Sequence, residues 1–99
     1  MSDEEIKAEA DEDTSLHILV ALRARQLTDH HGEFASPHEM YAVIFEEVCE
    51  FFDEVRRQDH ERCNARLMRE LLDIAAAALR AANQIARETG YGAEVLNAD

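Results

Sequence analysis

Two pairs of acidic residues stand out in this sequence as groups that could do chemistry: Glu47 with Glu50, and Glu70 with Asp73. Each pair has i, i+3 spacing, which on a helix places both carboxylates on the same face. Four carboxylates gathered on two facing helices repel one another unless a cation lies among them. Oxygen ligands favour Mg²⁺, with Mn²⁺ as an alternative, over zinc. The sequence therefore predicts a metal site formed by Glu47, Glu50, Glu70 and Asp73.

Glu47 also lies within an apolar stripe, where an unpaired charge is costly. With about 100° per residue, this stripe comprises Met40, Val43, Ile44, Val48, Phe51 and Val55. Glu70 lies on the edge of a second stripe, which comprises Leu67, Leu71, Ile74, Ala78, Ala81 and Ile85. A carboxylate in such a place is expected to be paired or bound to a metal ion.

A purely structural alternative is that Glu70 and Asp73 form i, i+4 ion pairs with Arg66 and Arg69 on a solvated face. Such pairs are worth only about 0.2–0.5 kcal/mol each, and they leave Glu47 unexplained. We therefore favour the metal site. For Tyr41, Phe45, Phe51, Phe52, Cys49 and Cys63 we expect packing in the core.

The composition predicts an all-α fold. The chain has 99 residues, 46% of them hydrophobic, with three glycines and one proline. We expect three main antiparallel helices that form a bundle over residues 14–90, between a disordered acidic tail (1–13) and a C-terminal tail (91–99). So small a domain buries little core, so we expect self-association to complete the bundle.

Local signals predict the helix ends. The first helix spans about 14–28, before a polar cluster that ends in Gly32. In the second helix Ser36 is the N-cap, Pro37 occupies the first position and Glu39 completes a capping box, with an end near Gln58.

The third helix follows a short polar connection, where Asp59 or Asn64 can serve as the N-cap, and ends before Gly90. A short connection makes the second and third helices antiparallel neighbours. At 1.5 Å rise per residue, Glu50 and Glu70 then lie at similar heights.

The net charge of −12 argues against nucleic acid as a partner, because binding to the phosphate backbone needs a basic surface. Seven acidic residues and one lysine fall within residues 1–13, so the tail carries half of this charge. No apolar run is long enough to span a membrane. Cys49 and Cys63 lack the spacing of a zinc site or a disulfide framework, and the five histidines lack HxxxH or ExxH spacing. We expect a cytoplasmic protein.

The motif Glu47-x-x-Glu50, nineteen intervening residues, then Glu70-x-x-Asp73 resembles the ExxE…ExxD signature of the MazG-like all-α nucleoside triphosphate pyrophosphohydrolases. The resemblance covers about residues 30–85 and is closest to small stand-alone members. It implies a helical protein that assembles as a homodimer or homotetramer. It also implies hydrolysis of a nucleoside triphosphate to the monophosphate and pyrophosphate, with Mg²⁺ held by the four acidic residues.

Within this resemblance, Glu46 or Glu47 is expected to orient the attacking water as the catalytic residue. The family's cationic phosphate ligand has no matching lysine here, so Arg80 is the expected substitute and Arg66 the second choice. The alternative function is a catalytically inactive helical interaction module of the same fold. A di-iron carboxylate protein is disfavoured, because Glu-x-x-His pairs are absent.

Overall fold

The computed structural model describes residues 3–57, 60 and 63–97, and of residues 3–14 it describes the helical backbone alone. The described residues form three α-helices, α1 (Asp3–His31), α2 (Pro37–Val55) and α3 (Asn64–Thr89), followed by a short 3-10 helix, η1 (Ala93–Asn97). The described residues contain no strand, so the all-α prediction is confirmed. No helix in this part of the chain combines the length and the hydropathy that a membrane crossing requires.

α1 is longer than the sequence analysis expected at both ends. It runs to His31, where Gly32 adopts φ = 77° and its N–H donates to the carbonyl of Thr28 at 2.7 Å. A left-handed glycine of this kind is a common helix stop, because no Cβ opposes the conformation. The side chains of residues 1–14 lie outside the described part, so the expected disorder of the tail 1–13 stays a prediction.

The predicted start of α2 is confirmed. The hydroxyl of Ser36 accepts a hydrogen bond from the N–H of Glu39 at 3.2 Å, and Pro37 is the first helical residue. The helix ends at Val55, slightly before the expected Gln58, which lies outside the described residues together with Asp59.

The expected end of α3 is also confirmed, whereas its N-cap differs from the prediction. Gly90, with φ = 76°, donates its N–H to the carbonyl of Ala86 at 2.8 Å and ends the helix. Cys63 occupies the N-cap position, and its own N–H is bound by the buried carboxylate of Glu54 at 3.0 Å. A contact across the turn therefore sets the start of this helix in place of a local side-chain cap.

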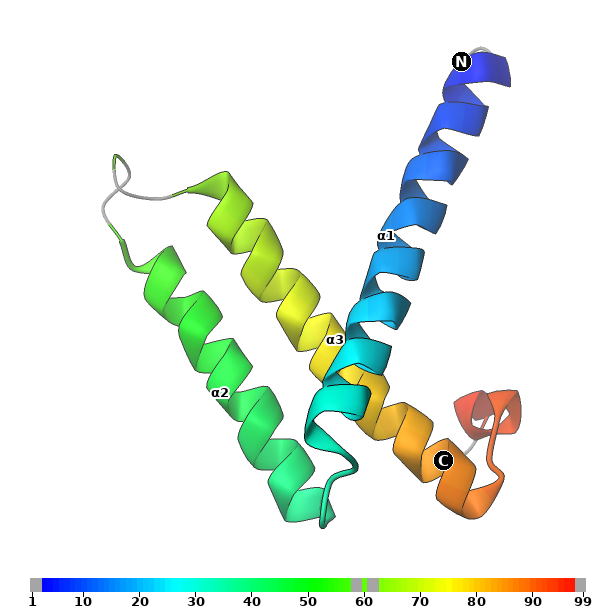
Figure 1. Cartoon of the computed structure of the whole chain (residues 1–99). Helices are drawn as coiled ribbons and strands as arrows, with labels where there is room; N and C mark the ends of the chain where they lie inside the picture. The colour runs from blue at the N-terminus through cyan, green and yellow to red at the C-terminus, as the bar shows by residue number, and fades with distance from the viewer. Residues whose placement is uncertain (1–2, 58–59, 61–62, 98–99) are drawn as a thin grey trace.

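α3 is the central helix of the fold. Figure 1 shows α2 and α3 side by side as an antiparallel hairpin, while α1 crosses α3. The backbones of α1 and α2 do not approach each other along their described lengths. α1 and α2 therefore pack on α3 from two sides and leave the space between their own backbones open.

The core around α3 is small. Its buried hydrophobic residues are Ala24, Phe34, Met40, Ala76, Ala77 and Ala81. Val43 and Ile44 of α2 are half-buried and pack against Phe34, Met40 and Ala81. Ala76 and Ala77, in the alanine run of α3, are 0% and 2% exposed. Short side chains at these positions let neighbouring helices come close to α3.

The segment between α1 and α2 is fastened to α3 by two polar side chains. The amide of Gln84 accepts from the N–H of Phe34 at 2.7 Å and donates to its carbonyl at 2.8 Å. Arg80 donates from Nη2 to the carbonyl of Gly32 at 2.9 Å. These three bonds fix where α2 begins relative to α3, and thus where the α2 carboxylates lie.

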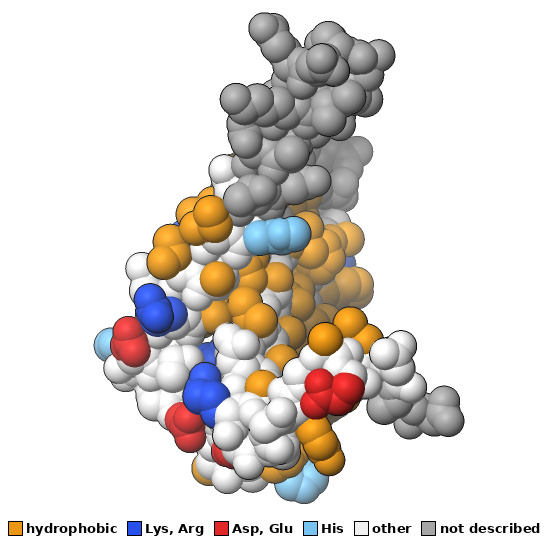
Figure 2. Space-filling model, turned by 90° about the vertical axis from the view of Figure 1, so that its right-hand side faces the viewer, with side chains coloured by type: hydrophobic (Ala, Val, Ile, Leu, Met, Phe, Trp, Pro, Cys, Tyr) orange, Lys and Arg blue, Asp and Glu red, His pale blue; other side chains and the backbone are white. Residues whose placement is uncertain are grey.

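The expected core packing of the aromatic residues is wrong for three of the four. Tyr41, Phe45 and Phe52 are 68%, 54% and 55% exposed, and Val48 and Val55, placed in the inner stripe of α2, are exposed too. α2 therefore has two apolar faces, and only one of them packs on α3. Figure 2, viewed from the side of α1, shows that hydrophobic side chains also reach the surface there; Ile18, Leu19 and Leu22 are about half exposed.

Candidate metal centre

Three of the four expected acidic residues converge in the α2–α3 hairpin. Glu47 of α2 and Glu70 and Asp73 of α3 each present one carboxylate oxygen, and these oxygens lie within 4.8 Å of one another. All three residues are half-buried. The i, i+3 spacing on α3 and the antiparallel hairpin bring them together, as the sequence predicts.

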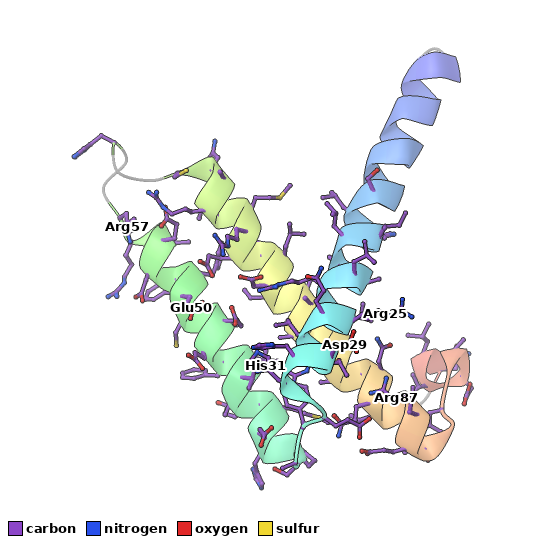
Figure 3. All side chains as sticks on the ribbon, viewed as in Figure 1. Arg25, Asp29, His31, Glu50, Arg57 and Arg87 are labelled. Atoms are coloured by element: carbon purple, nitrogen blue, oxygen red, sulfur yellow. The ribbon has the colours of Figure 1, made fainter. Side chains whose placement is uncertain are left out.

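Glu50, the fourth expected ligand, lies at the rim of this acidic cluster. Glu50 is exposed, and Figure 3 labels it on α2. Its carboxyl group is close enough to Glu47 and Glu70 to form hydrogen bonds with both and to raise their pKa values. It is not among the three residues whose oxygens converge.

The electrostatics of the cluster are unfavourable without a cation. Burial raises the pKa of Glu47 from 4.5 to about 7, and the charges of Glu50, Asp73 and Glu70 and a hydrogen bond with Glu50 contribute to the same shift. The pKa of Glu70 is raised by burial first and then by Glu50 and Asp73, while the charge of Arg69 opposes the shift. Desolvation and like charges therefore both favour the protonated acids.

Two oxygens of the cluster have no hydrogen-bond partner. They are Oε2 of Glu47 and Oε2 of Glu70, and both are buried. Buried polar atoms are almost always satisfied in folded proteins, so a pair of unsatisfied carboxylate oxygens needs a reason. An ion bound between them would supply one.

The dimensions of the cluster suit a small divalent cation. Two ligand oxygens of an octahedral Mg²⁺ ion, each at about 2.1 Å, are at most about 4.2 Å apart. The three oxygens lie within 4.8 Å of one another, and at least two of three octahedral ligand pairs are neighbours about 3.0 Å apart, so the carboxylates would need to close in by up to roughly 1–2 Å to share one ion. A donor set made only of carboxylates fits Mg²⁺ or Mn²⁺ better than zinc.

One positive charge reaches the cluster from α1. Nε of Arg23 lies 3.7 Å from Oδ1 of Asp73. The contact of Arg23 with the cluster was not predicted, because no local pattern marks a pairing between distant helices. Half of the Arg23 side chain is exposed, so this ion pair is weak and screened by solvent.

A pocket of about 540 Å³ adjoins the cluster and shares Glu47 with it. Glu46 and Arg80 line it as well, and His31 lies there between the end of α1 and α2 (Figure 3). The remaining lining residues are Leu27, Phe34, Glu39, Val43 and Ala77. The pocket therefore combines a carboxylate of the cluster with a buried cation.

Arg80 is held rigidly in this pocket. It is 6% exposed, its guanidinium lies 3.9 Å from the ring centre of Phe34, and Nη2 binds the carbonyl of Gly32. Its Nε is buried and has no hydrogen-bond partner. Of the two arginines expected to bind phosphate, Arg80 lines the pocket beside the cluster.

Arg66, the other expected arginine, does not line this pocket. Its Nε donates to both carboxylate oxygens of Glu54, each at 3.1 Å. Glu54 is 4% exposed and also accepts from Nε of Arg57 at 2.7 Å and from the N–H of Cys63. Burial acts to raise the pKa of Glu54, but the hydrogen bonds from Cys63 and Arg66 outweigh it and lower that pKa. The contacts of Glu54 were not predicted, since its partners converge only in the folded hairpin.

No protein-family model, curated protein or solved structure matches this chain. The resemblance to the MazG-like group therefore rests on the motif residues alone, and what it implies is carried forward below as a proposal.

Proposed function

We propose that this protein is a Mg²⁺-dependent nucleoside triphosphate pyrophosphohydrolase, which releases a nucleoside monophosphate and pyrophosphate. The observation that carries the proposal is the convergence of Glu47, Glu70 and Asp73 with two buried oxygens that lack partners. The pocket beside them, which contains Arg80, offers space and a cation for an anionic substrate. The resemblance of the ExxE…ExxD motif supplies the reaction type.

In this proposal Glu47, Glu70 and Asp73 hold the metal ion, and Glu50 joins them from the rim. Mn²⁺ is an alternative to Mg²⁺. When bound there, such an ion would polarise the phosphoryl group and lower the pKa of an attacking water. It also resolves a charge problem, because a chain with a net charge of −12 repels a triphosphate unless cations lie between the two.

The protein's own side chains position the reactants. Arg80 would bind a phosphate through a guanidinium that is already oriented by Phe34 and Gly32, so little conformational freedom is lost on binding. Arg66 could bind a phosphate only while its guanidinium also binds Glu54. Glu46 or Glu47 would accept a hydrogen bond from the attacking water and take its proton, while pyrophosphate leaves from the α-phosphorus.

The proposal includes assembly into a homodimer or homotetramer that completes an antiparallel bundle, and a location in the cytoplasm. The open arrangement around α3 and the exposed apolar residues of α2 favour assembly, because a single chain leaves them in contact with water. The two free cysteines are compatible with a reducing compartment.

Pyrophosphate release from a panel of ribo- and deoxyribonucleoside triphosphates tests the activity, with Mg²⁺ and with a chelator. We expect Glu47→Gln to lower the rate by at least about 100-fold, the usual effect of removing one key electrostatic group. Asp53→Asn is the matched control, because Asp53 is an exposed residue of α2 paired with Arg56.

The exposed apolar surfaces also suit the second candidate, a catalytically inactive helical interaction module. If the wild type and Glu47→Gln are equally inert across the whole panel, the enzyme proposal fails and the interaction module is preferred. Isothermal titration with Mg²⁺ then shows whether the cluster still binds a cation.

A further inference from the structure

The outward face of α2 carries a regular apolar stripe, here called the α2 seam, formed by Tyr41, Phe45, Val48, Phe52 and Val55. These residues are 68%, 54%, 42%, 55% and 38% exposed. Their spacing of four, three, four and three residues is that of the a and d positions in a coiled coil. Within the described part of the chain, α2 packs on α3 through a different face, so the α2 seam stays open.

The acidic side chains of α2 point away from the α2 seam, whereas the guanidinium of the C-cap Arg56 lies 4.9 Å from the ring centre of Phe52. On a helical wheel the acidic residues Glu39, Glu46, Glu50 and Asp53 lie about 120–180° from the centre of the seam. The positions that flank it are mostly uncharged and include Ala42 and Cys49. In a chain with a net charge of −12, such a strip lets two copies approach without bringing their acidic groups together.

We infer that the α2 seam binds the α2 seam of a second copy, antiparallel, with the twofold axis at Val48. A phenylalanine stands on either side of this residue, at Phe45 and Phe52, and Tyr41 and Val55 end the seam. Phe45 then faces the partner's Phe52, Tyr41 faces the partner's Val55, and the two Val48 side chains meet on the axis. A self-complementary patch of this kind is what a twofold interface requires.

The exposed area is adequate for such a dimer. With about 200 Å² for a fully exposed aromatic side chain, Tyr41, Phe45 and Phe52 offer roughly 350 Å² per chain. Two copies, with their valines and with Ala42 and Cys49 at the margins, approach the roughly 1,000 Å² that a specific interface needs. The inference gives the self-association in the proposed function a definite surface, whereas the acidic cluster lies on the other side of α2.

Cys49 provides a direct test of the antiparallel register. It is exposed and one residue from the proposed axis, so the two Cys49 side chains flank the axis on the same side. We expect a short bismaleimide to link two chains of the Cys63→Ser variant, and to link none of the Cys49→Ser variant. A parallel pair would place the two Cys49 side chains on opposite sides, so a dimer that Cys49 cannot link would overturn the inference.

Light scattering coupled to size exclusion tests the surface itself. One chain has a mass of 11.3 kDa, and we expect the wild type to show at least twice this value. The double variant Phe45→Glu with Phe52→Glu should at least halve the measured mass and keep its helical circular dichroism. Leu19→Glu, which changes an exposed leucine of α1 to the same extent, should keep the wild-type mass.

A wild type of 11.3 kDa, or a seam variant that keeps the wild-type mass, would overturn the inference. So would a loss of mass in Leu19→Glu alone, because the interface would then lie on α1. These measurements use neither nucleotide nor metal. A dimer without pyrophosphate release would therefore refute the proposed enzyme while leaving the α2 seam in place.

Discussion

Replacing Glu47 with glutamine should stabilise the metal-free protein in alkaline buffer. The folded protein raises the pKa of this carboxyl group from 4.5 to about 7. Between these two pH values the folded chain holds a proton that the unfolded chain has lost, so the free energy of unfolding falls as the pH rises. Above about pH 7 the full penalty applies, and it disappears below about pH 4.5.

The size of this penalty follows from the shift. At about 1.36 kcal/mol per pKa unit, the upper limit is roughly 3 kcal/mol. Glu47 is only half-buried, and solvent screens part of the repulsion, so we expect about 2–3 kcal/mol at pH 8. Glutamine has the same shape and no charge. At pH 5 the two proteins should differ by less than about 1 kcal/mol, since the wild-type group is then mostly protonated.

Thermal melts in a chelator at matched protein concentration measure this difference. For a domain of this size, about 2 kcal/mol raises Tm by at least about 8 °C, so Glu47→Gln should melt higher than the wild type at pH 8 and close to it at pH 5. Saturating Mg²⁺ should raise the wild-type Tm at pH 8 and leave that of Glu47→Gln almost unchanged. Asp53→Asn, which removes an exposed carboxylate, should follow the wild type in every condition.

The reasoning fails if Glu47→Gln melts at or below the wild-type temperature at pH 8 in chelator. It also fails if the gap between the two proteins is the same at pH 5 and pH 8, because a burial penalty on a charge must vanish when the charge is neutralised. If Mg²⁺ does not change the wild-type Tm, only the proposed metal binding is contradicted. The pH-dependent difference is measured in chelator and would still stand.

Two further substitutions test the contacts that position the hairpin and the loop before it. Gln84→Leu should destabilise the protein by about 2–4 kcal/mol, since the N–H and the carbonyl of Phe34 both lose their buried partner. Urea unfolding measures this loss, with Gln26→Leu, at an exposed position of α1, as the control. A urea midpoint that Gln84→Leu leaves unchanged would contradict the prediction. Glu54→Gln should lower Tm at pH 7, where the wild-type carboxylate is ionised and binds Arg57 and Arg66. Because the folded pKa of Glu54 is lowered, its stabilisation is present above about pH 4.5 and is lost as the pH falls through the folded value, so the two proteins should converge in acid. A difference that persists in acid would refute the assigned ion pairs.

The start of α2, the end of α3 and the acidic cluster were predictable from the sequence, because they depend on short-range rules, whereas both ends of α1 and the N-cap of α3 were not. Ser36, Pro37 and Gly90 act within one helical turn, so their positions alone set where α2 begins and α3 ends. The spacing within Glu70-x-x-Asp73 and the short connection before α3 bring those carboxylates to face Glu47. Whether a metal ion binds there stays a prediction.

Only the tertiary structure decided which apolar face of α2 is covered and which cations meet which acids. A helical wheel shows that Phe45 and Val48 are apolar, but not that α3 packs on the adjacent face and leaves them exposed. The pairing of Arg66 with Glu54 and of Arg23 with Asp73 likewise depends on the angles at which the helices pack. Such contacts join residues that are far apart along the chain, and periodicity within one helix carries no information about the neighbour that it will meet.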